Sequence, residues 1–209
     1  MKDMKPKVFI VEDDIDLLKA IEFTLSANQF RFQSFQSGEA FLSHLESPLS
    51  GLNEPAVVLL DIRLSGISGL QVFDRLDTLT FDASVVFMTG HGDIEMAVDV
   101  MKQGAYDFVT KPFKTTDLMK KIEVGYAQSV QRVDRRNQML DIQAKLDQLT
   151  PKEREVVQWI AAGETNKTIS DRLGNSVRTV ELHRARIFEK MDVQNAVELT
   201  KVLTRLDQQ

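Results

Sequence analysis

The sequence predicts a doubly wound α/β domain with a five-stranded parallel sheet, followed by a long linker helix and a small all-α domain. Three observations lead to this prediction. Short, unbroken apolar runs such as residues 56–60 are typical of strands buried on both faces of a parallel sheet. Helical patterns alternate with these runs, as the crossover connections between parallel neighbours require. After residue 149, helical patterns and helix-capping signals follow one another.

The first domain is expected to alternate strands and helices along its whole length. We expect strands at residues 7–11, 31–35, 56–61, 85–88 and 106–109. The helices between them are marked by apolar residues at helical spacing: Leu17, Leu18, Ile21 and Leu25; Phe41, Leu42 and Leu45 after a capping Ser37; Leu70, Phe73 and Leu76; and Ile94, Ala97, Val98 and Met101. A loop is expected from Ser47 to Pro55 and a long helix from about Thr116.

Composition excludes several classes of protein. The 209 residues fit two small domains, and the absence of Cys excludes disulfides, thiol nucleophiles and thiolate metal sites. Three scattered histidines argue against a zinc site. The sequence has neither an apolar run of membrane-spanning length nor the apolar core of a signal peptide, so we expect a cytoplasmic protein with no membrane partner.

Charge is shared unevenly between the two parts of the chain. The net charge is −5, but residues 149–209 hold 10 basic and 9 acidic side chains, against 16 basic and 22 acidic before them. This asymmetry favours an acidic metal-binding domain joined to a nucleic-acid-binding one.

Acidic side chains follow two of the predicted strands directly. Asp61 ends the apolar run that begins at Ala56, and Glu12, Asp13 and Asp14 follow the first strand. The carboxyl ends of parallel strands meet at one edge, so these acids are expected to converge. Clustered carboxylates repel one another unless a cation holds them, and an all-oxygen site suits Mg2+. Capping of the next helix is an alternative role for residues 12–14, but it does not explain Asp61.

Two further polar residues are expected at the same edge. Thr89 follows the fourth strand, and Lys111 follows the fifth. A hydroxyl, a cation and metal-binding acids are the groups needed to move a phosphoryl group onto Asp61 and hold it there. The alternatives are a helix-capping hydroxyl for Thr89 and a solvated surface cation for Lys111.

The motifs at these strand ends resemble those of the response-regulator receiver domain over about the first 125 residues. The matching segments are residues 8–14, 61–69, 89–93 and 111–113. The resemblance implies that Asp61 takes a phosphoryl group from the phosphohistidine of a sensor kinase. It also implies that Asp13, Asp61 and the main-chain carbonyl of Arg63 bind Mg2+, with Glu12 helping through water.

The same resemblance assigns the remaining residues of the site. Lys111 would pair with one phosphoryl oxygen, and Thr89 would move to hydrogen-bond another. Phe108 stands at the position of the aromatic switch residue, although a plain core aromatic is an equal alternative. Two residues depart from the family pattern: Glu12 replaces a common Asp, and Ser65 replaces a common Pro. Without the fixed dihedral of proline, we expect the loop beside Asp61 to be more mobile.

The segment from Thr116 to Gln148 lacks proline and predicts one long helix or two in line. Its apolar residues Met139, Ile142, Leu146 and Leu149 form a stripe that could pair with a second chain or pack against its own domains. A solvated face is expected from Arg132, Arg135 and Arg136.

The last part of the chain predicts a helix-turn-helix unit. Thr150, Pro151 and Glu153 have the spacing of a helix start with a capping box, and Gly163 ends that helix. Further helices are expected at residues 166–173 and 177–191, joined by a tight turn. The second helix of such a unit enters the major groove of DNA. Its exposed side is expected to hold Arg178, Glu181, Leu182, His183, Arg184, Arg186 and Lys190.

Residues 149–203 also resemble the LuxR-type DNA-binding domain, through residues 149–156, Gly163, 166–167, Ile169, 173–174, 179–180 and Val193. The resemblance places Glu181, Leu182 and Ala185 near bases, and Lys167, Arg178, Arg184 and Arg186 near phosphates. At position 181 the chain resembles the FixJ-type branch of regulators, which carry Glu there.

We therefore expect a transcriptional response regulator of the FixJ type and no enzyme, with a receiver at residues 1–125, a helical linker at 126–148 and a DNA-binding domain at 149–209. The expected partners are a sensor histidine kinase, double-stranded promoter DNA and a second copy of the chain after phosphorylation, with RNA polymerase as a further candidate. The rival is a phosphotransfer or phosphatase-type enzyme with a helical interaction domain. A haloacid-dehalogenase-like phosphatase would need Asp where Arg63 stands.

Overall fold

The computed structural model describes residues 6–47, 54–79, 81–90 and 94–206. The chain divides into two compact units, Met1–Asp134 and Arg135–Gln209. In the described part of the chain, no helix is both long and apolar enough to cross a membrane. Most of the loop expected between Ser47 and Pro55, at residues 48–53, lies outside the described residues.

A five-stranded parallel sheet of order β2-β1-β3-β4-β5 forms the centre of the first unit, which confirms the predicted fold class. The strands are β1 Lys7–Val11, β2 Arg31–Phe35, β3 Ala56–Asp61, β4 Ser84–Thr89 and β5 Asp107–Thr110. All six residues of β3 are buried because helices cover both faces of the sheet. The order of the strands in the sheet changes direction between β1 and β3. These two strands are parallel neighbours, so their carboxyl ends lie next to each other.

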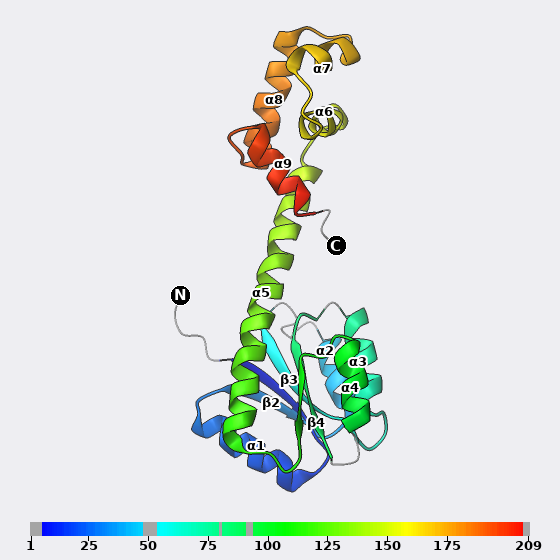
Figure 1. Ribbon diagram of the computed structural model, residues 1–209, viewed down its shortest axis with the longest axis vertical. Helices are drawn as coiled ribbons and strands as arrows, with labels where there is room; N and C mark the ends of the chain where they lie inside the picture. The colour runs from blue at the N-terminus through cyan, green and yellow to red at the C-terminus, as the bar shows by residue number, and fades with distance from the viewer. Residues whose placement is uncertain (1–5, 48–53, 80, 91–93, 207–209) are drawn as a thin grey trace. The chain divides into compact units, whose positions relative to one another are not determined.

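The two faces of the sheet belong to separate hydrophobic cores. Successive residues of β1 alternate between them, with Phe9 and Val11 in one core and Val8 and Ile10 in the other. The first core packs against α2 Gly38–Leu45, α3 Gly69–Thr78 and α4 Ile94–Lys102, and the second against α1 Ile15–Ala27 and α5 Thr115–Asp147. Figure 1 shows these helices on opposite sides of the sheet.

Helix α4 departs from the expected apolar pattern. Val98 and Met101 mark the helix as predicted, but their side chains are 45% and 37% exposed. The side chains of Ile94 and Ala97 lie outside the described residues. The spacing of apolar residues therefore located α4 correctly, but part of its apolar surface faces solvent.

Two residues of α5, Ser129 and Arg132, form hydrogen bonds with the first residues of β3 and β4. Arg132 donates from Nη2 to the hydroxyl of Ser84 at 2.6 Å, and this hydroxyl donates to the carbonyl of Gly125, also at 2.6 Å. The hydroxyl of Ser129 accepts from the amide of Ala56 at 3.0 Å. The expectation of a solvated Arg132 is thus wrong, because its guanidinium is used within the first unit.

The second unit consists of the end of α5 together with α6 Pro151–Ala161, α7 Asn166–Leu173, α8 Val177–Met191 and α9 Ala196–Thr204. Its core includes Ile142 and Leu149, and Leu146 packs against it. Three of the four residues of the predicted stripe therefore pack against their own domain, one of the two alternatives for it. Helix α9 was not expected from the sequence, although Asn195 caps it and Leu199 is fully buried.

Candidate functional site

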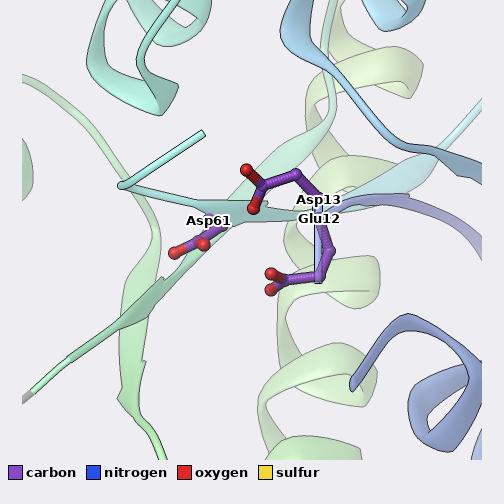
Figure 2. A group of neighbouring side chains, drawn as sticks. All are labelled: Glu12, Asp13 and Asp61. Atoms are coloured by element: carbon purple, nitrogen blue, oxygen red, sulfur yellow. The ribbon is translucent and has the colours of Figure 1, made fainter. Parts of the chain in front are cut away.

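Three carboxylates meet at the carboxyl edge of the sheet. Asp61 is the last residue of β3, and Glu12 and Asp13 directly follow β1. One side-chain oxygen from each of the three lies within 4.8 Å of the others (Figure 2). Glu12 is 1% exposed and Asp61 is 6% exposed, whereas Asp13 is more open to solvent. The convergence predicted from the strand ends is therefore present in the structure.

Helix capping is carried by the next acid along the chain. The side chain of Asp14 accepts from the amides of Asp16 and Leu17 at the start of α1, at 3.0 and 3.2 Å. Because Asp14 takes this role, Glu12 and Asp13 are left to the acidic cluster.

Lys111 joins the two most buried acids. Its Nζ lies 2.7 Å from Oε2 of Glu12 and 2.9 Å from Oδ2 of Asp61. Burial by itself would lower the pKa of Lys111, but its hydrogen bonds to these two carboxylates outweigh burial and raise the pKa. The alternative of a solvated surface lysine does not hold, because the side chain is only 23% exposed.

The pKa of Glu12 is raised, chiefly because the carboxyl is buried and also because the charge of Asp61 is near. Lys111 acts in the opposite direction but offsets only part of this effect. With its groups ionised, the cluster holds three carboxylates against one ammonium. A divalent cation with oxygen ligands would balance that remaining charge, so the residues fit Mg2+.

The loop that follows Asp61 is held against the third acid. The amide and the hydroxyl of Ser65 both donate to Oδ2 of Asp13, at 2.9 and 2.5 Å. The hydroxyl bond is the main reason why the pKa of Asp13 is lowered. The constraint lost with proline at this position is thus replaced by two hydrogen bonds, which the sequence reasoning missed. The signal available was a hydroxyl four residues after Asp61 at the acidic edge of the sheet.

Gly69 lets this loop close onto the strand that it leaves. Its amide donates to the carbonyl of Ile62 at 3.0 Å, and α3 begins at Gly69. A Cβ atom at this position would lie 2.0 Å from the carbonyl oxygen of Asp61. Only glycine allows the helix to start so close to the carboxyl end of β3.

Thr89 and Phe108 occupy the neighbouring strands. Thr89 is completely buried, and its hydroxyl donates to the carbonyl of Val109 at 3.4 Å rather than to Asp61. Phe108 on β5 is partly buried against the core beneath α2, α3 and α4. Arg63 has an exposed side chain, and its amide donates to Oδ1 of Asp61 at 3.3 Å.

The second unit presents a helix-turn-helix surface. Helix α7 ends at Gly174 with φ of 62°, and Ser176 caps α8. Val180, Ile187 and Met191 bury one face of α8. The exposed residues of the surface, which we call the recognition face, are Lys167 on α7 and Arg178, Glu181, Leu182, Ala185 and Arg186 on α8.

Two basic residues of α8, Arg184 and Lys190, were expected on its exposed side but are half-buried. Arg184 is half-buried, and its guanidinium carbon lies 5.4 Å from the centre of the Phe188 ring, a cation–π arrangement. Lys190 is not on the recognition face. Its Nζ donates to Oε2 of Glu153 at 2.6 Å and to the carbonyl of Gln148 at 3.2 Å.

Glu153 links this pair to the start of α6. Its carboxylate accepts from the amide of Thr150 at 2.9 Å, and the hydroxyl of Thr150 accepts in return from the amide of Glu153, which confirms the capping box. Burial would raise the pKa of Glu153, but the hydrogen bonds with Lys190 and Thr150 and the charge of Lys190 together outweigh burial, and the pKa is lowered. Lys190 therefore stabilises the domain.

Two protein families match consecutive parts of the chain. Residues 8–123 match the response regulator receiver domain, and residues 147–203 match the luxR family of bacterial regulatory proteins. The chain is 35% identical to the transcriptional regulatory protein FixJ of Rhizobium meliloti, over 93% of both chains. It is 37% identical to the tetrathionate response regulatory protein TtrR of Salmonella typhimurium, over 93% of this chain and 90% of the relative.

A solved structure of a response regulator is also similar to this chain over nearly its whole length. The response regulator StyR is 31% identical and superposes with a TM-score of 0.83, covering 96% of this chain and 99% of StyR. Both units and their order along the chain are thus shared with response regulators. The chain belongs to the response regulators that combine a receiver domain with a LuxR-type DNA-binding domain, and it is a DNA-binding transcriptional regulator.

Proposed function

We propose that Asp61 is the phosphoacceptor and that its phosphorylation controls DNA binding by this regulator. The observation that carries the proposal is the position of Asp61, at the carboxyl end of the fully buried β3 and 2.9 Å from the ammonium of Lys111. A carboxylate so placed can attack a phosphorus atom from the edge of the sheet while Lys111 pairs with a phosphoryl oxygen.

The donor is the phosphohistidine of a sensor kinase. A carboxylate oxygen of Asp61 forms a bond to phosphorus as the bond between phosphorus and the imidazole nitrogen breaks. The chain accepts one phosphoryl group and does not turn over phosphate esters as a phosphatase would. Arg63, two residues after the acceptor, supports this because it cannot act as the second acid of such an enzyme.

The magnesium site is formed by Asp13, Asp61 and the main-chain carbonyl of Arg63, with Glu12 acting through water. Mg2+ bound there would neutralise charge on the group being transferred. The more open Asp13 gives the ion an approach from solvent, while Lys111 keeps the buried Glu12 and Asp61 paired in its absence.

The switch uses the hydroxyl of Thr89. In the structure this hydroxyl faces the carbonyl of Val109 at 3.4 Å, a long hydrogen bond that is easily exchanged. A phosphoryl group on Asp61 draws the hydroxyl away, and Phe108 on the neighbouring strand follows into the space vacated. The surface beyond, from Ile94 to Tyr126, changes shape and pairs with a second chain.

The division of labour follows the chain: residues 1–125 accept the phosphoryl group, 126–148 link, and 149–209 bind promoter DNA. On the recognition face, Glu181, Leu182 and Ala185 lie near bases, while Lys167, Arg178 and Arg186 contact phosphates. Arg184 reaches phosphate from its position over Phe188. A promoter-bound regulator works in the cytoplasm, where RNA polymerase is a further candidate partner.

The test is chemical labelling with a small phosphodonor and Mg2+. We expect one acid-stable, base-labile acyl phosphate per chain, absent in Asp61→Asn and strongly reduced in Asp13→Ala. The amide lacks the nucleophilic oxygen anion, and alanine removes a metal ligand. The matched control is Asp107→Asn, which changes an acid of the same sheet that pairs with Lys121 instead. Labelling of Asp61→Asn at the wild-type level would refute the assignment.

A further inference from the structure

The loop between β3 and α3 is held at alternate residues by carboxylates from three different elements. The amides that donate, with their acceptors and N···O distances, are Arg63 to Asp61 Oδ1 at 3.3 Å, Ser65 to Asp13 Oδ2 at 2.9 Å, and Ile67 to Glu39 Oε1 at 3.0 Å. Of these acids, one ends β3, one follows β1, and one lies in α2. Ser65 thus connects the loop after β3 to Asp13, the acid of the cluster that follows β1.

Ser65 differs from the other two donors because it also gives its hydroxyl. The amide and the hydroxyl both bind Oδ2 of Asp13, the hydroxyl at 2.5 Å. A carboxylate oxygen has about two acceptor sites, so these two donors occupy Oδ2 fully. Neither donor of Ser65 uses Oδ1, and one carboxylate oxygen of Asp13 lies within 4.8 Å of an oxygen of Glu12 and of an oxygen of Asp61 (Figure 2).

We propose that Ser65 is a positioning residue of the magnesium site: by holding Oδ2 of Asp13 it presents Oδ1 to the cation, and it fixes the loop that carries the carbonyl of Arg63. The inference rests on the proposed function, since it assigns these groups as ligands. Ser65 itself does not touch the ion. It acts through Asp13, in the way that outer hydrogen-bond donors orient metal ligands elsewhere.

The physical reason lies in the exposure of Asp13. Unlike Glu12 and Asp61, Asp13 makes no ion pair with a lysine of the described residues and is not enclosed by the core, so its carboxylate would otherwise rotate between rotamers. Ordering a side chain when an ion binds costs free energy. Ser65 orders the carboxylate beforehand, and the same bond brings the two segments that carry ligands to a fixed separation.

The experiment measures Mg2+ binding without any phosphodonor, from amide chemical shifts during a titration of the full chain. We expect Ser65→Ala to raise the dissociation constant about tenfold, since loss of an outer partner costs 10–100-fold and the amide donor remains. Ser65→Thr keeps the hydroxyl and should restore wild-type affinity. In labelling, Ser65→Ala should need more Mg2+ for half-maximal reaction but reach the wild-type extent at saturation.

The matched control is Ser68→Ala, which removes a hydroxyl from the same loop. Ser68 caps α3 by accepting from the amide of Gln71 and has no bond to the acidic cluster, so its loss should leave Mg2+ affinity unchanged. Unchanged or tighter Mg2+ binding by Ser65→Ala would overturn the inference, as would equal weakening by Ser68→Ala. If the wild-type chain showed no Mg2+-dependent shifts, or Asp61→Asn were still labelled, the proposed function itself would fail.

Discussion

Lys111 is the residue on which the electrostatics of the acidic cluster depend. Its ammonium lies within 2.9 Å of both Glu12 and Asp61, which are almost completely buried. When one partner of a buried ion pair is removed, the other charge stays buried without compensation, and the folded state is strongly destabilised. The lysine therefore stabilises the first unit as well as the phosphoryl group that it is proposed to bind.

We predict that Lys111→Ala lowers the free energy of unfolding by about 3 kcal/mol without Mg2+. Added Mg2+ should recover part of the loss, because it supplies a cation to the same carboxylates. Denaturant unfolding followed by circular dichroism measures both effects. As a control, Lys102→Ala removes an ammonium from an exposed pair with Asp99 and should change little. Equal losses in the two variants would contradict the prediction.

At the scale of elements, the capping box of α6 is locked by the last turn of α8. Glu153 is 2% exposed and accepts from both Thr150 and Lys190. Its pKa is lowered in the folded chain. The carboxylate therefore contributes stability above its unfolded pKa of about 4.3, and this contribution is lost as the pH falls through the lower folded value.

We predict that Glu153→Gln destabilises the second unit near pH 7, that the difference from wild type shrinks as the pH falls below about 4.3, and that it disappears only below the lowered folded pKa of Glu153, where both states bind a proton. Trp159, the only tryptophan, lies in α6, so its fluorescence reports the unfolding of this unit. Glu155→Gln, which disrupts an exposed pair with Lys152, is the control. A pH-independent difference would show that the charge of Glu153 is unimportant.

We predict that residues of the recognition face on α8 divide into those that read bases and those that contact phosphates. Arg186→Ala should weaken binding to all DNA sequences alike and lower the salt slope by about one unit. If Glu181 reads a base, Glu181→Ala should relax preference at one position, costing about 1–3 kcal/mol on the preferred site. Titrations of a preferred and a scrambled duplex at several salt concentrations distinguish the two. Equal losses on both duplexes for Glu181→Ala would mean that it does not read a base.

At the scale of the whole molecule, α5 is packed into the core of each unit. Leu118 and Ile122 of α5 belong to a core of the first unit, and Ile142 of α5 belongs to the core of the second unit. A change in the first unit can therefore act on the same helix that helps to build the second. Val98 and Met101 on α4 are exposed and offer apolar surface that the proposed pairing with another chain would bury.

We predict that phosphorylation converts monomers to dimers and that Val98→Glu prevents this conversion while Asp61 is still labelled. The carboxylate introduced at position 98 would be buried when two chains pair, which disfavours the dimer. Position 98 lies outside the acidic cluster, so labelling of Asp61 should continue. Sedimentation at micromolar concentrations with phosphodonor and Mg2+ measures the dimer fraction, with Asp61→Asn as the monomeric control. A dimer fraction that is the same with and without the phosphoryl group would exclude phosphorylation as the cause.

The sequence by itself determined the features that depend on local patterns. Apolar runs ending in Asp61 and Glu12 placed the acids at one sheet edge, because parallel strands share a direction. Capping signals at Ser37 and Thr150 placed the starts of α2 and α6, because a cap involves residues three apart. Helix α9 was missed although its cap and apolar spacing were equally local.

Only the tertiary structure decided the partners of polar side chains. Ser65 binds Asp13 across 52 residues, Arg132 binds Ser84 across 48, and Lys190 binds Glu153 across 37. From the sequence, Ser65 predicted a more mobile loop, Arg132 was expected on a solvated face, and Lys190 was expected on the exposed side of the helix that enters the DNA groove. Periodicity tells which face of an element is buried, but it does not tell which polar group meets another when distant elements pack together. These long-range hydrogen-bond partners are set by that packing, so they were found only in the folded chain.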